Sequence, residues 1–304
     1  MSAAYGAFIM RKAAVLLVGA LALLLFIGAS MIQSLFVIQR FAAVREVSGK
    51  VEVKAAGEEA FGPLGDARHV RAGDVVRTAE DGGVTLNWVD GSRIRLGPNT
   101  EMTVLQCQID KTKQAQSYLF KLDVGQVWVR VLQTLGRQSK FEIQTPTATA
   151  AVRGTVFSVE VDDAGATTVS VLKGEVALEG AGSNLSVRER QEAAVSVSET
   201  RPTRPMTPER ETEWEVARVV AEPWLRLTQP ASDGLPQGAS FLSVSGDTER
   251  GAVVTVNGKP VVPNMMQSFT VDVPIPEGAE EFEITARARD AKGFETVVVK
   301  RLSR

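Results

Sequence analysis

Alternation of apolar and polar residues dominates the chain between residues 44 and 197. Valine, leucine or isoleucine occupies every second position in several short stretches, with polar residues between them. Because successive side chains of a strand point to opposite faces, the pattern predicts many short, half-buried β-strands. The clearest stretches are residues 47–53, 84–88, 94–96, 127–131, 169–171 and 176–178. We therefore expect an all-β fold here, a rolled β-sheet or sandwich.

Two local signals add detail to this sheet. The pair Asp90-Gly91 lies between two apolar stretches and predicts a tight hairpin, since glycine accepts the positive φ of such a turn. Beside Gly154 the alternation slips by one residue, between Val156 and Phe157. An extra residue in a strand next to a glycine is typical of a β-bulge, so we predict a bulge at this point.

The N-terminal region has a different pattern. Residues 13–32 are apolar or small, with Ser30 as the one hydroxyl, and residues 35–38 extend the apolar run. About twenty helical residues span the hydrocarbon core of a bilayer. We predict a short tail over residues 1–12 and a transmembrane signal-anchor helix over residues 13–39. A cleaved signal peptide is the alternative, because residues 28–30 are small.

A change of composition marks residues 198–222. Pro202 and Pro205 alternate with charged residues, which predicts an extended linker. A short helix should begin with Thr207 as N-cap and Pro208 at its first position, and end before Pro223. Its apolar stripe predicts packing against a neighbouring domain: Trp214, Ala217, Val220 and Ala221.

Residues 223–304 again show strand patterns, separated by the turn pairs Asn257-Gly258, Glu277-Gly278 and Lys292-Gly293. The unit resembles bacterial immunoglobulin-like modules, and the resemblance implies a β-sandwich. Such modules occur in proteins of many functions, so the resemblance assigns no activity.

One stretch resembles the core signature of the FecR domain, which is named after a bacterial iron-siderophore signalling protein. It comprises Thr145, Pro146, Ala148, Ala150, Val152, Arg153, Gly154, Thr155, Val156 and Phe157. Pro146 lacks a backbone N–H, so a chain bend is expected there. The resemblance covers roughly residues 44–197. It implies a β domain of the bacterial cell envelope and implies no reaction.

Candidate functional residues are few. Arg153 is suited to forked hydrogen bonds that pin the bend after Pro146, with a ligand contact as the alternative. Trp128 falls on the polar-facing side of its strand and is our candidate for stacking on a sugar, whereas Trp88 is in phase with core residues. The signature residues Thr145, Pro146, Val152, Arg153, Gly154 and Thr155 are expected to act structurally.

Composition argues against several classes of function. The 304-residue chain has a formal net charge of −2, which gives no basic face for nucleic acid. Its single cysteine, Cys107, is expected to be a buried strand residue, and its single histidine, His69, a solvated loop residue. The acidic pairs lie in turn-like stretches where carboxylates cap the backbone. We predict no catalytic residue, no metal site and no cofactor.

The sequence thus favours a non-enzymatic protein of the bacterial inner membrane, with most of the chain in the periplasm. Lysine and arginine flank both sides of the anchor, so this orientation rests on the FecR resemblance. Its expected partners are the membrane and an envelope protein, polysaccharide or peptidoglycan. A transmembrane signalling component is the first alternative. Because residues 1–12 hold no helical domain for a sigma factor, that role would need a separate membrane partner. An accessory carbohydrate-binding protein is the second.

Overall fold

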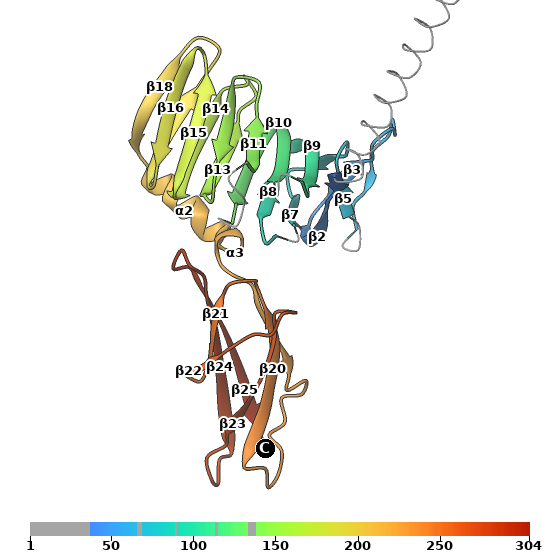
Figure 1. Cartoon of the computed structure of the whole chain (residues 1–304), viewed down its shortest axis with the longest axis vertical. Helices are drawn as coiled ribbons and strands as arrows, with labels where there is room; N and C mark the ends of the chain where they lie inside the picture. Colours follow the sequence, from blue (N-terminus) through green and yellow to red (C-terminus); the bar gives the residue numbers. More distant parts are fainter. Residues whose placement is uncertain (1–36, 66–68, 89, 113–114, 133–137) are drawn as a thin grey trace, which may run out of the picture.

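The computed structural model describes residues 37–65, 69–88, 90–112, 115–132 and 138–304. These residues form two β domains, which a pair of short helices connects (Figure 1). The N-terminal domain runs from strand β1 to strand β18 and the C-terminal domain from β19 to β25. The predicted all-β class is therefore confirmed.

Two sheets form the N-terminal domain, and strand β10 (Ala115–Arg130) belongs to both. Its first half pairs with β9 and β11 in sheet A, and its second half pairs with β8 and β13 in sheet B. In order, sheet A contains β4 (Gly62–Pro63), β3 (Val51–Lys54), β6 (Val75–Thr78), β9 (Glu101–Asp110), β10, β11 (Lys140–Gln144), β12 (Ala148–Val152), β15 (Glu175–Gly180) and β16 (Ser183–Arg188). Strand β1 (Val37–Gln39) also joins this sheet, beside the end of β9.

Sheet B contains β5 (His69–Arg71), β2 (Phe41–Ser48), β7 (Gly83–Asn87), β8 (Arg93–Leu96), β10, β13 (Val156–Val161), β14 (Thr167–Lys173), β17 (Gln191–Val195) and β18 (Thr200–Pro205). The apolar residues of the alternating stretches meet in one core, which includes Trp88 and Cys107 as expected. His69 is exposed, as predicted, but lies on strand β5 and packs edge-on against Phe41.

The local signals for turns and bulges are confirmed. Strands β7 and β8 form the predicted hairpin, and Gly91 has φ +86°. The pairing of β13 with β14 shifts register between Val156 and Phe157, where the slip in alternation predicted a bulge. The chain bends between β11 and β12, at Pro146.

Two predicted boundaries need correction. Val37–Gln39 form strand β1, which pairs with β9, so the end of the predicted anchor helix lies too far along the chain. The rest of that prediction, with the tail, lies outside the described residues. Within the described part of the chain no helix has the length and apolar character to cross a membrane.

The second correction concerns the linker. Thr200–Pro205 is strand β18, paired with β17 at the edge of sheet B. Proline suits an edge strand because its missing N–H leaves no pairing partner unsatisfied there. The proline-rich composition therefore reflected an edge strand and not a free connection.

Helix α2 (Pro208–Val216) begins as predicted, with the Thr207 hydroxyl accepting a hydrogen bond from the Arg210 N–H. Helix α3 (Arg218–Ala221) follows and ends before Pro223. The apolar stripe of these helices is buried in a small cluster with Trp128 and Val156 of the N-terminal domain. The predicted packing face is thus confirmed, and it covers part of the outer side of sheet B.

The C-terminal domain is a sandwich of two antiparallel sheets around a separate core. One sheet has the order β19 (Leu225–Gln229), β20 (Phe241–Thr248), β23 (Ser268–Pro274). The other has the order β22 (Lys259–Val261), β21 (Val253–Val256), β24 (Glu281–Arg289), β25 (Glu295–Ser303). The three predicted turn pairs lie between strands β21 and β22, β23 and β24, and β24 and β25.

Candidate functional site at the domain junction

The junction between the two β domains begins with two arginines of sheet B. Arg93 opens strand β8 and Arg130 closes strand β10, and the antiparallel register places them directly opposite each other. Like charges in that position repel unless anions lie between them or beside them. Two opposed arginines at this end of the sheet are therefore stable only with carboxylates beside them.

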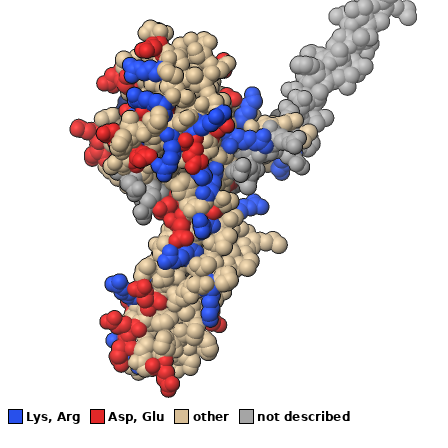
Figure 2. Space-filling view, turned by 90° about the vertical axis from the view of Figure 1, so that its left-hand side faces the viewer, with Lys and Arg blue, Asp and Glu red and all other residues tan. Residues whose placement is uncertain are grey.

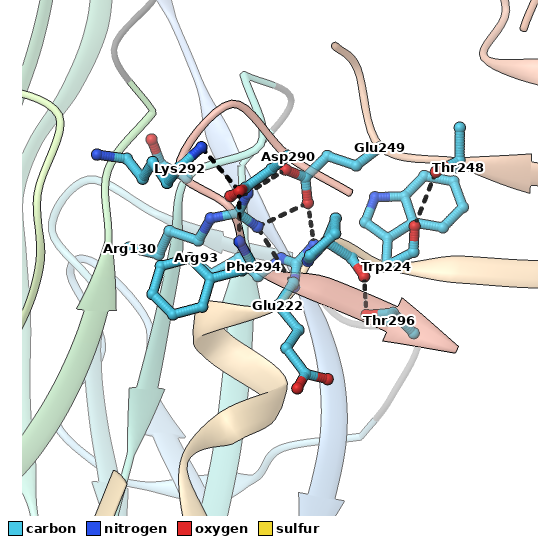
Figure 3. Close-up of polar contacts among 12 residues, drawn as sticks. Arg93, Arg130, Glu222, Trp224, Thr248, Glu249, Asp290, Lys292, Phe294 and Thr296 are labelled. Carbon is cyan, nitrogen blue, oxygen red and sulfur yellow. Dashed lines mark hydrogen bonds and ion pairs between the residues drawn. The ribbon is translucent and has the colours of Figure 1, made fainter. Parts of the chain in front are cut away.

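Two carboxylates of the C-terminal domain pair with these arginines (Figure 3). Arg130 donates to Glu249 through Nη1 at 2.9 Å and lies 2.6 Å from its other oxygen through Nη2. The same Nη2 lies 2.8 Å from Asp290, and Arg93 donates to Glu249 as well. Arg93, Arg130, Glu249 and Asp290 are at most 8% exposed. We call these four residues the junction network.

Burial makes this network costly to disturb. Taking a charge out of water costs several kcal/mol, which only well-placed opposite charges and hydrogen bonds offset. Burial lowers the pKa of the Arg93 guanidinium, and the neighbouring Glu249 carboxylate opposes that shift. With two positive and two negative groups, the network is balanced only while the domains are docked.

Backbone groups complete the contact. The Glu222 carbonyl, just after helix α3, accepts hydrogen bonds from Arg93 at 2.7 Å and Arg130 at 3.2 Å. On the C-terminal side, the Thr296 hydroxyl donates to the Pro223 carbonyl, and the Thr248 hydroxyl donates to the Trp224 carbonyl at 3.1 Å. The connection between the domains is thereby tied to both of them.

The FecR-like signature also reaches the junction. Lys292, in the turn after β24, donates through Nζ to the Gly154 carbonyl at 2.5 Å. Burial lowers the pKa of this lysine, while the nearby Asp290 carboxylate raises it. Gly154 has φ +68°, a conformation that favours glycine, so the carbonyl that Lys292 contacts is set by the signature.

Three other signature residues hold this segment: Thr145 and Thr155 bond to the backbone, and Val152 packs in the core. The Thr145 hydroxyl accepts from the Ala148 N–H at 2.9 Å across the bend at Pro146. The Thr155 hydroxyl donates to the Glu175 carbonyl at 2.8 Å, and the Thr155 carbonyl accepts from the Val131 N–H at 2.9 Å. Val152 ends strand β12 and packs against the core.

The prediction for Arg153 is wrong. Its side chain is exposed and makes no hydrogen bond or ion pair with any described residue, whereas we expected it to pin the bend. The backbone and Thr155 hold this segment instead. Arg153 is therefore free at the surface beside Gly154.

The prediction for Trp128 is wrong as well. The alternation correctly placed it on the outer side of sheet B, opposite Val127 and Val129. That side is covered by helices α2 and α3, however, so Trp128 is only 7% exposed and packs with Trp214 and Ala217. It is unavailable for stacking on a sugar.

Sequence reasoning missed the junction network. Arg93 and Arg130 occupy polar positions of their strands, where a solvated side chain is the ordinary interpretation. Their partners lie more than a hundred residues further along the chain. Two arginines at strand ends that pair in a sheet were the only local signal. Among the described residues, no group of three or more histidine, cysteine, aspartate or glutamate side chains is arranged to hold a metal ion.

Comparison with known proteins identifies the domain. Residues 74–177 match the family model described as "FecR protein". A search of curated proteins gave no match. Two crystal structures of a protein from Parabacteroides distasonis, described as a "putative anti-sigma factor", are similar at 17% identity and a TM-score of 0.38. The alignments cover 46% of this chain and 63% and 64% of those chains, less than two thirds of their length. The chain therefore carries a FecR domain, and Gly154 of its signature contacts the C-terminal β-sandwich.

Proposed function

We propose that this protein is a non-enzymatic scaffold of the bacterial cell envelope, in which the FecR domain and the C-terminal sandwich act as one rigid binding unit. The observation that supports this is the junction network. Four buried charges, two from each domain, are paired here, and Arg130 lies 2.6 to 2.9 Å from its carboxylate partners. Domains that move freely seldom bury charge between them, because every opening exposes unpaired partners.

The proposal includes an anchor in the inner membrane and a periplasmic location for both β domains. Its support is the apolar run of residues 13–32, together with the FecR domain. Alkaline phosphatase, which needs disulfides to be active, reports the compartment when it is fused after Arg304. Activity in the membrane fraction is expected, and an inactive but well-expressed fusion would contradict the location.

We further propose that the C-terminal sandwich is an immunoglobulin-like module. Its two sheets, β19-β20-β23 and β22-β21-β24-β25, correspond to the strand orders A-B-E and C′-C-F-G of that architecture. Such a module presents loops and sheet edges for binding, and the junction network fixes their direction relative to the FecR domain.

Rigidity can be measured with spin labels on the full chain in lipid nanodiscs. Cysteines that replace the exposed residues Glu179, on β15, and Glu281, on β24, carry one label on each domain. The native Cys107 is buried and stays unlabelled. A single narrow distance distribution is expected. A broad distribution, or one that varies with ionic strength, would show that the domains move independently and would refute the rigid scaffold.

Signalling is the second candidate, and the FecR domain match favours it. A rigid pair of periplasmic domains suits a component that passes a binding event to a separate membrane partner. Crosslinking in cells followed by co-purification distinguishes the two. Recovery of one membrane protein that itself binds a sigma factor would favour signalling, whereas recovery of envelope polymer would favour the scaffold.

A further inference from the structure

A groove lies on the outer side of sheet B, away from the junction. It has a cavity volume of about 370 Å³ and is bounded by strand β17, strand β18 and the start of helix α2. A smaller hollow of about 130 Å³ adjoins it and shares Thr168, Ala194 and Arg201. Their volume suits one or two sugar-sized groups. Figure 2 shows the side of the molecule on which β18 and α2 lie, where charges of both signs gather.

Strand β18 shapes this groove. Glu192 pairs with Arg204, but Ala194 pairs with Arg201, so β18 carries one extra residue opposite Ala193. Such a bulge bends a strand and re-aims its side chains. The small side chain of Ala194 leaves the floor open, whereas the same face is filled by Trp128 and helix α2 nearby.

A buried carboxylate fixes the cations of the groove. Glu192 is 4% exposed and accepts from Arg204 at 2.8 Å through Nε, and a second Arg204 nitrogen lies 2.7 Å away. Arg210 lies 4.0 Å from its other oxygen and is also paired with Glu160 and Glu213. Burying a carboxylate costs free energy unless it is paired with a cation. Glu192 therefore holds the Arg204 guanidinium in place beside the groove.

Arg201 has N–H donors that its weak ion pair leaves available to a ligand. Its one ion pair with a described residue, Glu199, is long at 3.7 Å, and both side chains are largely exposed. Arg204 is 65% exposed beyond its contact with Glu192. Two guanidinium groups that still present N–H donors at a groove match a carboxylate, which they bind through paired hydrogen bonds.

The smaller hollow, which shares Arg201 with the groove, suits hydroxyl groups. Asp162 and Glu199 line the smaller hollow with Ser196 and Thr168. Asp162 already accepts from the N–H groups of Ala164 and Ala166, so it needs no cationic ligand to be satisfied. Remaining lone pairs on such oxygens accept hydrogen bonds from hydroxyls.

We propose that this groove binds a sugar acid, with the carboxylate on Arg201 and Arg204 and ring hydroxyls toward Asp162 and Glu199. This names a ligand class for the proposed binding role and rests on it. An acidic peptide is the competing ligand, but it offers fewer hydroxyl donors to Asp162 and Glu199 in the smaller hollow.

The test uses the full chain in detergent and ligand-observed NMR with a galacturonic acid oligomer. Expected results are binding of this oligomer and none of a neutral galactose oligomer of equal length. Arg201→Gln should weaken binding roughly tenfold or more, the range for a charge-assisted contact. Ala194→Leu, which fills the floor, should abolish binding. The matched control, Arg301→Gln, removes a similarly exposed paired arginine on the other domain and should change nothing.

Three results overturn the assignment: no binding of the acidic oligomer, equal binding of the neutral oligomer, or unchanged binding by Arg201→Gln. Tighter binding of a glutamate-rich peptide would assign the groove to peptides instead. None of these outcomes alters the distance distribution between the two labelled domains. Failure of the groove assignment is therefore distinguishable from failure of the rigid scaffold.

Discussion

Substitution of Arg130 by methionine tests whether the junction network holds the two domains together. Methionine keeps much of the length and apolar stem of arginine but removes every donor. Arg130 is fully buried, and its loss leaves Asp290 without its Arg130 partner and Glu249 with Arg93 alone. Breaking a buried pair in this way costs about 3–5 kcal/mol, because the remaining charge stays out of water.

The two domains have separate cores, so this cost need not unfold either of them. Undocking lets Glu249 and Asp290 reach water instead. A penalty of about 3 kcal/mol lowers the ratio of docked to undocked molecules roughly 150-fold. With labels on Glu179→Cys and Glu281→Cys, we expect a broad distance distribution to replace the narrow one, while circular dichroism still reports folded sheets.

Two further variants separate charge from packing. Arg301→Met removes an arginine that is 84% exposed in its pair with Glu283, and should leave the distribution unchanged. Replacing all four charges of the network, with Arg93→Met, Arg130→Met, Glu249→Met and Asp290→Asn, leaves no unpaired buried charge and should recover much of the docked population. A narrow distribution in Arg130→Met itself would refute the reasoning, because it would show that apolar contacts suffice.

Three other predictions concern single residues of the FecR domain. Burial raises the pKa of the Cys107 thiol to about 12, so iodoacetamide at pH 8 should leave the folded chain unmodified and label it quantitatively in denaturant, as mass spectrometry would show. Gly125→Ala should lower the free energy of unfolding in a urea titration by more than about 2 kcal/mol, since a Cβ would lie 2.5 Å from Thr100 Cα at φ +93°. Gly182 has φ +72° but open space around it, so Gly182→Ala should cost only about 1 kcal/mol in the same titration. Burial raises the pKa of Asp90, so the wild-type chain should lose stability relative to Asp90→Asn as pH rises above about 4, and a constant difference across pH would contradict this.

Local pattern predicted the strands, turns and bulge because those features depend on neighbouring residues. The slip between Val156 and Phe157 was visible in the sequence, since one extra residue changes which face each side chain takes. Trp128 shows the limit of that reasoning. Alternation placed it on the correct face, but only the tertiary structure determines whether a helix covers that face.

The edge strand β18 shows a second limit. Its prolines indicate that one side of the segment is unpaired, which is true both of a free linker and of the last strand of a sheet. To recognise a strand here, one must already know that β17 lies beside it. The junction network lies further still from local inference, because its members come from four strand ends in two domains.

The signature of the FecR domain therefore has two physical roles in this chain. Gly154 adopts a left-handed backbone in the connection between β12 and β13, and this conformation sets the carbonyl that Lys292 contacts. A substitution at Gly154 would strain this connection and also misplace that carbonyl, so local fold and domain docking are coupled at one residue. Arg153 remains exposed beside this contact and has no described partner. The side chain of Arg153 therefore takes no part in docking the two domains.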